Sequence, residues 1–260
     1  MVIGINHAAG SRPLAGAVAD AKNLGKALSK YGFLETNVSM LLDGEATRSE
    51  ILSKLDELAA KTPKDGVAVF ALASHTRKHG GQSHLVAADG RLISASELAG
   101  RLAKVKSKMW VALPTCYAGG YALPGVVGND RVATFASSAK EESFELGTAG
   151  SYLFINMVRK AMIEGRAPNS VESAFKFAEA EIRRTAPRRV PFMADGVKGD
   201  LVLGVYEKGR VADLAAPKPA PSSAPKYEPS PDDQAYAPQP TPVPRSRRGI
   251  RVCGRLRINC

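Results

Sequence analysis

Residues 108–121, KMWVALPTCYAGGY, decide how the rest of the chain is interpreted. Residues 109–113 form an apolar run that ends at Pro114, and Cys116 follows in a turn of small residues. A continuous apolar run of this length is typical of a central strand in a parallel sheet covered on both faces. Open α/β sheets place their chemistry just beyond the carboxyl ends of the strands. The pattern therefore puts Cys116, the only cysteine before residue 253, where a reactive group is expected.

A second apolar run, VAVFALA at residues 67–73, ends in the same way, in Ser74 and His75. If the two strands are parallel neighbours, His75 and Cys116 emerge at one edge of the sheet. A thiol needs a base or a cation beside it because the thiolate is the nucleophile, and histidine supplies both near neutral pH. Taken alone, Cys116 could be a small buried hydrophobe and His75 a loop histidine. Complementary residues at two consecutive strand ends strengthen the case for a Cys–His pair, and both interpretations stay open on this pattern alone.

The composition is that of a globular protein. With 260 residues, 44% hydrophobic and 23% charged, the chain can bury a full core in one domain. The formal net charge of +11 suggests an anionic partner, but the excess is spread unevenly and we predict no specific nucleic-acid partner. Three cysteines, two of them in the last eight residues, form no disulfide framework for the main domain.

No targeting or membrane segment is recognisable in the sequence. It has no apolar run of about eighteen residues, which predicts that no transmembrane segment is present. Residues 2–6 read as a strand directly after Met1, without the basic and apolar regions of a signal peptide. The default prediction is a cytoplasmic protein. A periplasmic or secreted protein is the alternative if a leader is missing from this chain.

Strand and helix patterns alternate along residues 1–207. Strands are predicted at residues 2–6, 37–42, 67–73, 84–88, 109–113, 131–136 and 200–206, and residues 76–83 are predicted as a loop. Helices are predicted at residues 14–31, after Thr47, and at residues 94–105, 151–164 and 169–184. Thr47 and Ser94 are each followed three residues later by Glu, which is a helix-start signal. The alternation predicts an α/β fold, a three-layer αβα sandwich with a mostly parallel central sheet.

The character of the chain changes at residues 208–260. Ten prolines lie between residues 217 and 244, which predicts an extended linker, and the last sixteen residues hold six arginines and no acid. We predict a Pro-rich, basic, disordered tail or the remnant of a missing domain. A patch for nucleic acid or an anionic membrane is the alternative, and Cys253 and Cys260 could form a small disulfide loop in an exported chain.

Four segments, taken in order, carry a family resemblance. They are IGIN at residues 3–6, PLAGAVADAKNLGKAL at 13–28, FALASH at 70–75 and PTCYAGG at 114–120. Together they resemble the caspase-fold cysteine peptidases, which include caspases, metacaspases and legumains. Members typically show a strand ending in Ser/Asp-Gly-His-Gly and, one strand later, Asp/Glu-Ala-Cys. Residues 116–144 are especially similar to bacterial legumain-type members, and the resemblance covers about residues 2–206.

The resemblance implies peptide-bond hydrolysis through an acyl-enzyme, with a protein or peptide as substrate and no metal or organic cofactor. It implies that Cys116 attacks the carbonyl and that His75 is the acid/base. Backbone N–H groups of Cys116 and Thr76 would hold the oxyanion, and Ser137 falls in the stretch that forms a wall of the substrate pocket. It leaves the oligomeric state and the cleavage-site preference open.

Two histidines compete for the catalytic assignment. His79 precedes two glycines and so matches the family's His-Gly pair superficially. His75 directly ends the apolar strand and lies at the family's distance from the next strand. We assign His75 as the base because position at a strand end outweighs a dipeptide match.

Three departures from the family pattern keep a second function open. Ser74 and Thr76 stand where glycines usually flank the histidine, and Pro114 stands where metacaspases carry an acid. The alternative is therefore a catalytically inactive caspase-fold interaction module. A nucleotide-binding α/β domain is a third possibility, but no Gly-x-Gly-x-x-Gly or Walker sequence follows any predicted strand.

Overall fold

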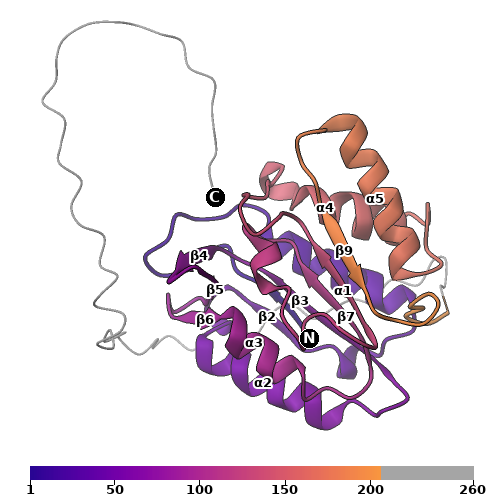
Figure 1. The fold of residues 1–260 in the computed structure, drawn as a ribbon, viewed down its shortest axis with the longest axis horizontal. Coiled ribbons are helices and arrows are strands. Elements are labelled where there is room, and N and C mark those ends of the chain that lie inside the picture. Colours follow the sequence, from indigo (N-terminus) through magenta and orange to yellow (C-terminus); the bar gives the residue numbers. More distant parts are fainter. Residues whose placement is uncertain (206–260) are drawn as a thin grey trace, which may run out of the picture. The chain divides into compact units, whose positions relative to one another are not determined.

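A six-stranded sheet forms the centre of the protein. The computed structural model describes residues 1–205, so the predicted tail and its boundary after residue 207 lie outside the described residues. The strand order is β2 (Met40–Leu42), β1 (Val2–Gly4), β3 (Val67–Ala73), β7 (Lys108–Leu113), β8 (Arg131–Phe135) and β9 (Phe192–Asp195) (Figure 1). The first five strands are parallel, and β9 runs antiparallel to β8.

Helices cover both faces of this sheet. On one face lie α1 (Ala17–Lys30), the single turn α4 (Tyr152–Phe154), the π-helical stretch η5 (Ile155–Ile163) and α5 (Val171–Thr185). On the other face lie α2 (Arg48–Lys61) and α3 (Ala95–Leu102). The structure confirms the α/β class with a mostly parallel sheet between two helical layers.

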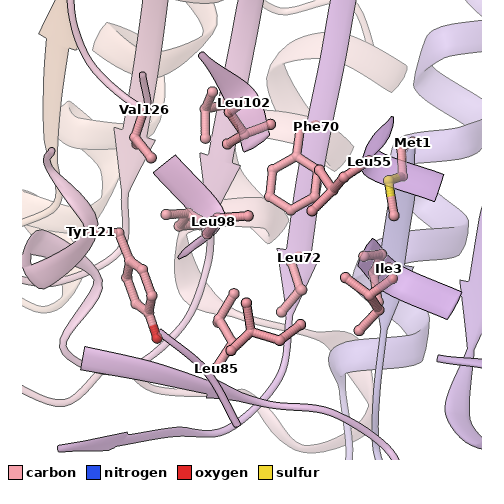
Figure 2. Close-up of a cluster of buried hydrophobic side chains, with 14 of the residues drawn as sticks. Met1, Ile3, Leu55, Phe70, Leu72, Leu85, Leu98, Leu102, Tyr121 and Val126 are labelled. Carbon is pink, nitrogen blue, oxygen red and sulfur yellow. The ribbon is translucent and has the colours of Figure 1, made fainter. Parts of the chain in front are cut away.

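Alternate residues of the central strands enter two separate cores. Phe70 and Leu72 of β3 pack with Leu55 of α2 and Leu98 of α3, as Figure 2 shows. Val69 and Ala71 belong to the cluster on the opposite face, with α1 and α5. Because both faces of β3 are buried, its sequence is continuously apolar, as a strand covered on both sides requires.

The predicted helix-start signals are confirmed. Thr47 Oγ1 accepts a hydrogen bond from Glu50 N at 3.3 Å, and α2 begins at the next residue. Ser94 Oγ accepts from Glu97 N at 3.1 Å at the start of α3. Each side chain satisfies one of the backbone donors that a helix leaves unpaired at its N-terminus.

The loop predicted at residues 76–83 is wrong, because these residues form most of a β-hairpin. A second, antiparallel sheet contains β4 (Thr76–His79), β5 (Gln82–Val86) and β6 (Leu92–Ser94). The turn between β4 and β5 is Gly80–Gly81, with φ of 55° and 78°. Two consecutive positive φ angles suit a two-residue hairpin, for which a Gly-Gly pair is a known sequence signal.

The strand predicted at residues 200–206 is also wrong over its described part. Residues 201–205 contain no strand, and the last strand within residues 1–205 is β9, which pairs antiparallel with β8. The Glu172 carboxylate accepts from Leu201 N at 2.9 and 3.0 Å, and Leu201 O accepts from Val171 N at 3.0 Å. Leu201 and Leu203 are buried because they pack against the helical layer, not because they join the sheet.

One further result concerns membranes: none of the helices within residues 1–205 has the length and apolar character needed to span a bilayer.

Candidate active site

The two predicted catalytic residues follow neighbouring strands. β3 and β7 are parallel and pair from Val67 with Lys108 to Ala71 with Ala112. His75 comes two residues after β3 and Cys116 three residues after β7, so both stand at the carboxyl edge of the sheet. This places the pair together at the edge where the sequence pattern predicts chemistry.

A narrow cavity of about 10 Å³ joins them. It is lined by Leu14, Ala17, Ala73, Ser74, His75, Pro114, Thr115, Cys116, Ser143 and Glu145. A volume of this size holds about one water molecule, so a substrate side chain cannot enter without movement of a wall.

The Cys116 thiol is covered by the segment that follows β8. The residue is 4% exposed, and its Sγ lies 3.8 Å from both the carbonyl oxygen and the hydroxyl of Ser143. Sequence reasoning did not identify Ser143, because its contact with the thiol comes from a loop and follows no strand end.

The His75 ring is oriented by a backbone carbonyl. Its Nε2 lies 2.6 Å from the carbonyl oxygen of Arg12, in the loop between β1 and α1. A carbonyl oxygen only accepts, so Nε2 carries a hydrogen and Nδ1 is the basic nitrogen of the neutral ring. A base whose other nitrogen is held by a third group is the arrangement expected beside an activated nucleophile.

The backbone at Thr76 tolerates a residue larger than glycine. Val86 N donates to His75 O at 3.0 Å, and Thr76 stands opposite Leu85 in the antiparallel pairing. This makes Thr76 and Leu85 a non-hydrogen-bonded pair, so the Thr76 N–H is directed away from β5. Within residues 1–205 the non-glycine residues with positive φ are Asp43, Tyr117 and Asp130, so threonine at position 76 meets no left-handed strain.

The turn after Cys116 is backbone-strained. Tyr117 has φ 52° and ψ 29°, a left-handed conformation that costs a non-glycine residue roughly 1–2 kcal/mol. Hydrogen bonds hold it there: among them, its N–H donates to Glu141 O at 2.8 Å, and its hydroxyl donates to Glu142 Oε1 at 3.0 Å. The strained residue lies directly beside the candidate nucleophile, as is common at functional sites.

Ser137 is hydrogen-bonded to both sides of Cys116. It is 3% exposed, donates from Oγ to Thr115 O at 3.2 Å and accepts from Ala118 N at 3.2 Å. Its carbonyl accepts from Gly119 N at 3.0 Å. These contacts favour a role in holding the cysteine turn, while its contact with substrate stays a prediction.

Two carboxylates link the loop after β8 to the start of α1. Glu145 Oε2 accepts from Ala15 N at 3.0 Å, and Asp20 accepts from Ser151 N at 3.1 and 2.9 Å. Burial raises the pKa of Asp20 well above its usual value, hydrogen bonding to Ser151 opposes that rise, and the nearby Glu145 adds to it. The cavity wall formed by Ser143 and Glu145 is therefore anchored on α1.

Metal ligands do not gather in the described part of the chain. Within residues 1–205 no group of three or more His, Cys, Asp or Glu side chains could hold a metal ion. The absence of a cofactor stays a prediction.

Comparison with known families identifies the class of protein. The family model of the caspase domain matches residues 1–198, so the chain belongs to the caspase-domain family. This agrees with the resemblance described above at the level of the family. None of the curated proteins matches the chain.

Two solved structures share the fold. A Geobacter sulfurreducens protein aligns with a TM-score of 0.63 and 15% identity, over 82% of this chain and 98% of that one. Caspase-1 from Spodoptera frugiperda aligns with a TM-score of 0.60 and 17% identity, over 80% of this chain and 88% of that one. At these identities the likeness concerns the fold, which is caspase-like.

Proposed function

We propose that this caspase-family chain is a cysteine endopeptidase that uses a Cys116–His75 dyad. The observation that supports the proposal most strongly is that both residues line one cavity at the carboxyl edge of β3 and β7. The hydrogen bond from His75 Nε2 to Arg12 O adds to it, because it leaves Nδ1 as the proton acceptor. Family membership supports peptide hydrolysis as the reaction. We also propose that, within this class, the chain is most similar to bacterial legumain-type peptidases, on the resemblance of residues 116–144.

The reaction has two halves. Cys116 Sγ forms a bond to the substrate carbonyl carbon as its proton passes to His75 Nδ1, and the carbonyl becomes an oxyanion. Backbone N–H groups of Thr76 and Cys116 stabilise that oxyanion. His75 then gives its proton to the amine as the C–N bond breaks, which leaves a thioester. Water, deprotonated by His75, hydrolyses the thioester and frees Cys116. No metal or organic cofactor is needed.

Substrate entry requires the segment of residues 138–146 to move. The present cavity of about 10 Å³ admits about one water molecule, and Ser143 covers the thiol. Movement of this segment would open the cavity and expose Cys116 at the same time.

The burial of Cys116 also favours a second candidate, an inactive interaction module. A thiol that is 4% exposed and stays covered cannot attack a peptide. The two functions differ in whether Cys116 becomes accessible to a peptide-sized reagent.

Activity profiling on a peptide library tests the dyad. We expect Cys116→Ala to abolish hydrolysis and His75→Ala to lower it about a hundredfold to ten-thousandfold, the usual contribution of general acid–base catalysis. His79→Ala is the matched control, because His79 is exposed on β4 with its ring 5.8 Å from that of His84. If His79→Ala is inactive while His75→Ala keeps near-full turnover, the assignment of the base is wrong.

A further inference from the structure

A row of hydroxyl groups connects the two candidate catalytic segments. Thr115 Oγ1 donates to Ser74 O at 2.5 Å, and it lies 2.9 Å from Thr76 Oγ1. Thr76 Oγ1 lies 3.3 Å from Tyr121 Oη. Thr115 is 2% exposed and Tyr121 is fully buried, among the apolar side chains of Figure 2. Ser74 and Thr76 flank His75, and Thr115 precedes Cys116.

The hydrogen bonds in this row run in one direction. Each hydroxyl has a single hydrogen, and that of Thr115 is used on the Ser74 carbonyl. Thr76 must therefore donate to Thr115, and Tyr121 must donate to Thr76. Burial raises the pKa of Tyr121, which keeps its hydroxyl in the protonated, donating form. The row of donors begins at Tyr121 and ends at a backbone carbonyl, with every hydroxyl hydrogen used.

The Thr115–Ser74 bond continues the pairing of β3 with β7 where the backbone cannot. The last paired residues of the ladder, Ala71 and Ala112, are 41 positions apart, and so are Ser74 and Thr115. Pro114 lies between Ala112 and Thr115 in the chain, and proline has no N–H to donate to the neighbouring strand. A side-chain hydroxyl therefore joins the two strand ends at the point where the histidine and the cysteine depart from them.

We propose that the Tyr121–Thr76–Thr115 hydroxyl row is a positioning device that fixes the His75 segment against the Cys116 segment. The three hydroxyl groups act by fixing the backbone of the two segments and touch no reacting atom. The proposal rests on the proposed function for its catalytic consequence, because the two N–H groups assigned to the oxyanion belong to Thr76 and Cys116. A threonine follows His75 and another precedes Cys116, where the family pattern has Gly and Ala. The hydrogen bond between Thr76 Oγ1 and Thr115 Oγ1 needs a hydroxyl at both positions, so it accounts for both departures from the family pattern.

The connection between the His75 segment and the Cys116 segment can be measured without peptidase activity. Hydrogen exchange of the amides in residues 74–77, followed by mass spectrometry, should be about tenfold faster in Thr115→Val than in the wild type, because one buried hydrogen bond is lost. Tyr121→Phe should accelerate exchange there less, since it removes the longest bond of the row. Thr115→Ser keeps the hydroxyl and should restore the wild-type rate.

A matched control separates coupling from general loss of stability. Thr134 is fully buried on β8, and its Oγ1 accepts from Trp110 Nε1 at 3.0 Å, away from the hydroxyl row. Thr134→Val should speed exchange across the domain without singling out residues 74–77. If Thr115→Val leaves residues 74–77 unchanged relative to the rest of the domain, or if Thr115→Ser behaves like Thr115→Val, the proposal is overturned.

Two reagents test whether the hydroxyl row affects stabilisation of the oxyanion. A peptidyl aldehyde forms an oxyanion on reaction with the thiol, whereas iodoacetamide alkylates it without one. We expect Thr115→Val to weaken aldehyde binding about tenfold and to leave the rate and pH profile of alkylation unchanged. An equal loss with both reagents would overturn the oxyanion role. If the wild type binds no aldehyde and cleaves no peptide, the proposed function fails, while the exchange measurement still decides whether the row couples the segments.

Discussion

Replacing Ser137 by alanine tests how the cysteine turn is held. The side chain donates to Thr115 O and accepts from Ala118 N, each at 3.2 Å, on either side of Cys116. Alanine keeps the β-carbon and removes only the hydroxyl, so the change leaves almost no cavity and isolates the two hydrogen bonds.

The size of the effect follows from burial. Ser137 is 3% exposed, so water cannot replace its hydroxyl, and both backbone groups lose their partner. An unsatisfied buried donor or acceptor costs about 1–3 kcal/mol. A small change in the turn at Ala118 can let the two backbone groups find other partners. Two unpaired groups would together cost about 2–6 kcal/mol, and partial re-pairing removes the upper part of that range, so we expect the free energy of unfolding to fall by about 2–4 kcal/mol.

Urea unfolding measures the stability, and peptide hydrolysis measures the effect on the site. We expect Ser137→Ala to lower kcat more than it raises KM, because Cys116 loses its alignment while the substrate pocket keeps its walls. Ser53→Ala, on the exposed face of α2, is the control and should change neither quantity. An unchanged unfolding free energy together with a raised KM would refute this reasoning and support direct contact between Ser137 and substrate.

Three further predictions concern the carboxylates and the thiol. The pKa of Asp20 is raised above its ordinary 3.8, so its stabilising contribution is complete below pH 3.8 and is lost as pH rises through the folded-state pKa. Asp20→Asn mimics the protonated form, and thermal unfolding from pH 4 to pH 8 should show it gaining stability relative to the wild type as pH rises; a constant difference would contradict this. Glu145 brings a carboxylate to the lining of the cavity, and no Lys or Arg is among the lining residues. A peptide library should therefore show that Lys or Arg is preferred over Asp at the residue before the cleaved bond. Glu145→Gln, which can keep the Ala15 bond, should reduce that preference about threefold to tenfold, and an unchanged ratio would exclude Glu145 from specificity. Cys116→Ala should leave the unfolding free energy within about 1 kcal/mol of the wild type, because one small buried side chain replaces another; a larger loss would mean that the thiol is structural.

The sequence predicts the centre of the fold well because apolar runs and helix caps are local signals. VAVFALA and the run before Pro114 mark two neighbouring strands, and Thr47 and Ser94 mark helix starts that the structure confirms. The small β4–β5 hairpin was missed because TRKH is polar and half exposed, although the Gly80–Gly81 pair was a usable signal.

The remaining parts of the site depend on contacts that no local pattern specifies. Ser143 reaches the thiol, and Glu145 reaches Ala15, from a loop far along the chain. The Thr115–Ser74 bond likewise joins residues 41 positions apart. Residues 201–205, LVLGV, are apolar like a buried strand, but Leu201 and Leu203 pack on helices, so an apolar run alone could not distinguish this segment from the sheet.

Covalent labelling by a peptidyl electrophile tests the central claim, that Cys116 and His75 form a working dyad, most directly. Intact-protein mass spectrometry should show one label per chain on Cys116 in the wild type and in His79→Ala. We expect Cys116→Ala to take no label and His75→Ala to take it at least about a hundredfold more slowly, since the thiol loses its base. Failure of the wild type to be labelled, or equal rates in the wild type and His75→Ala, would contradict the account.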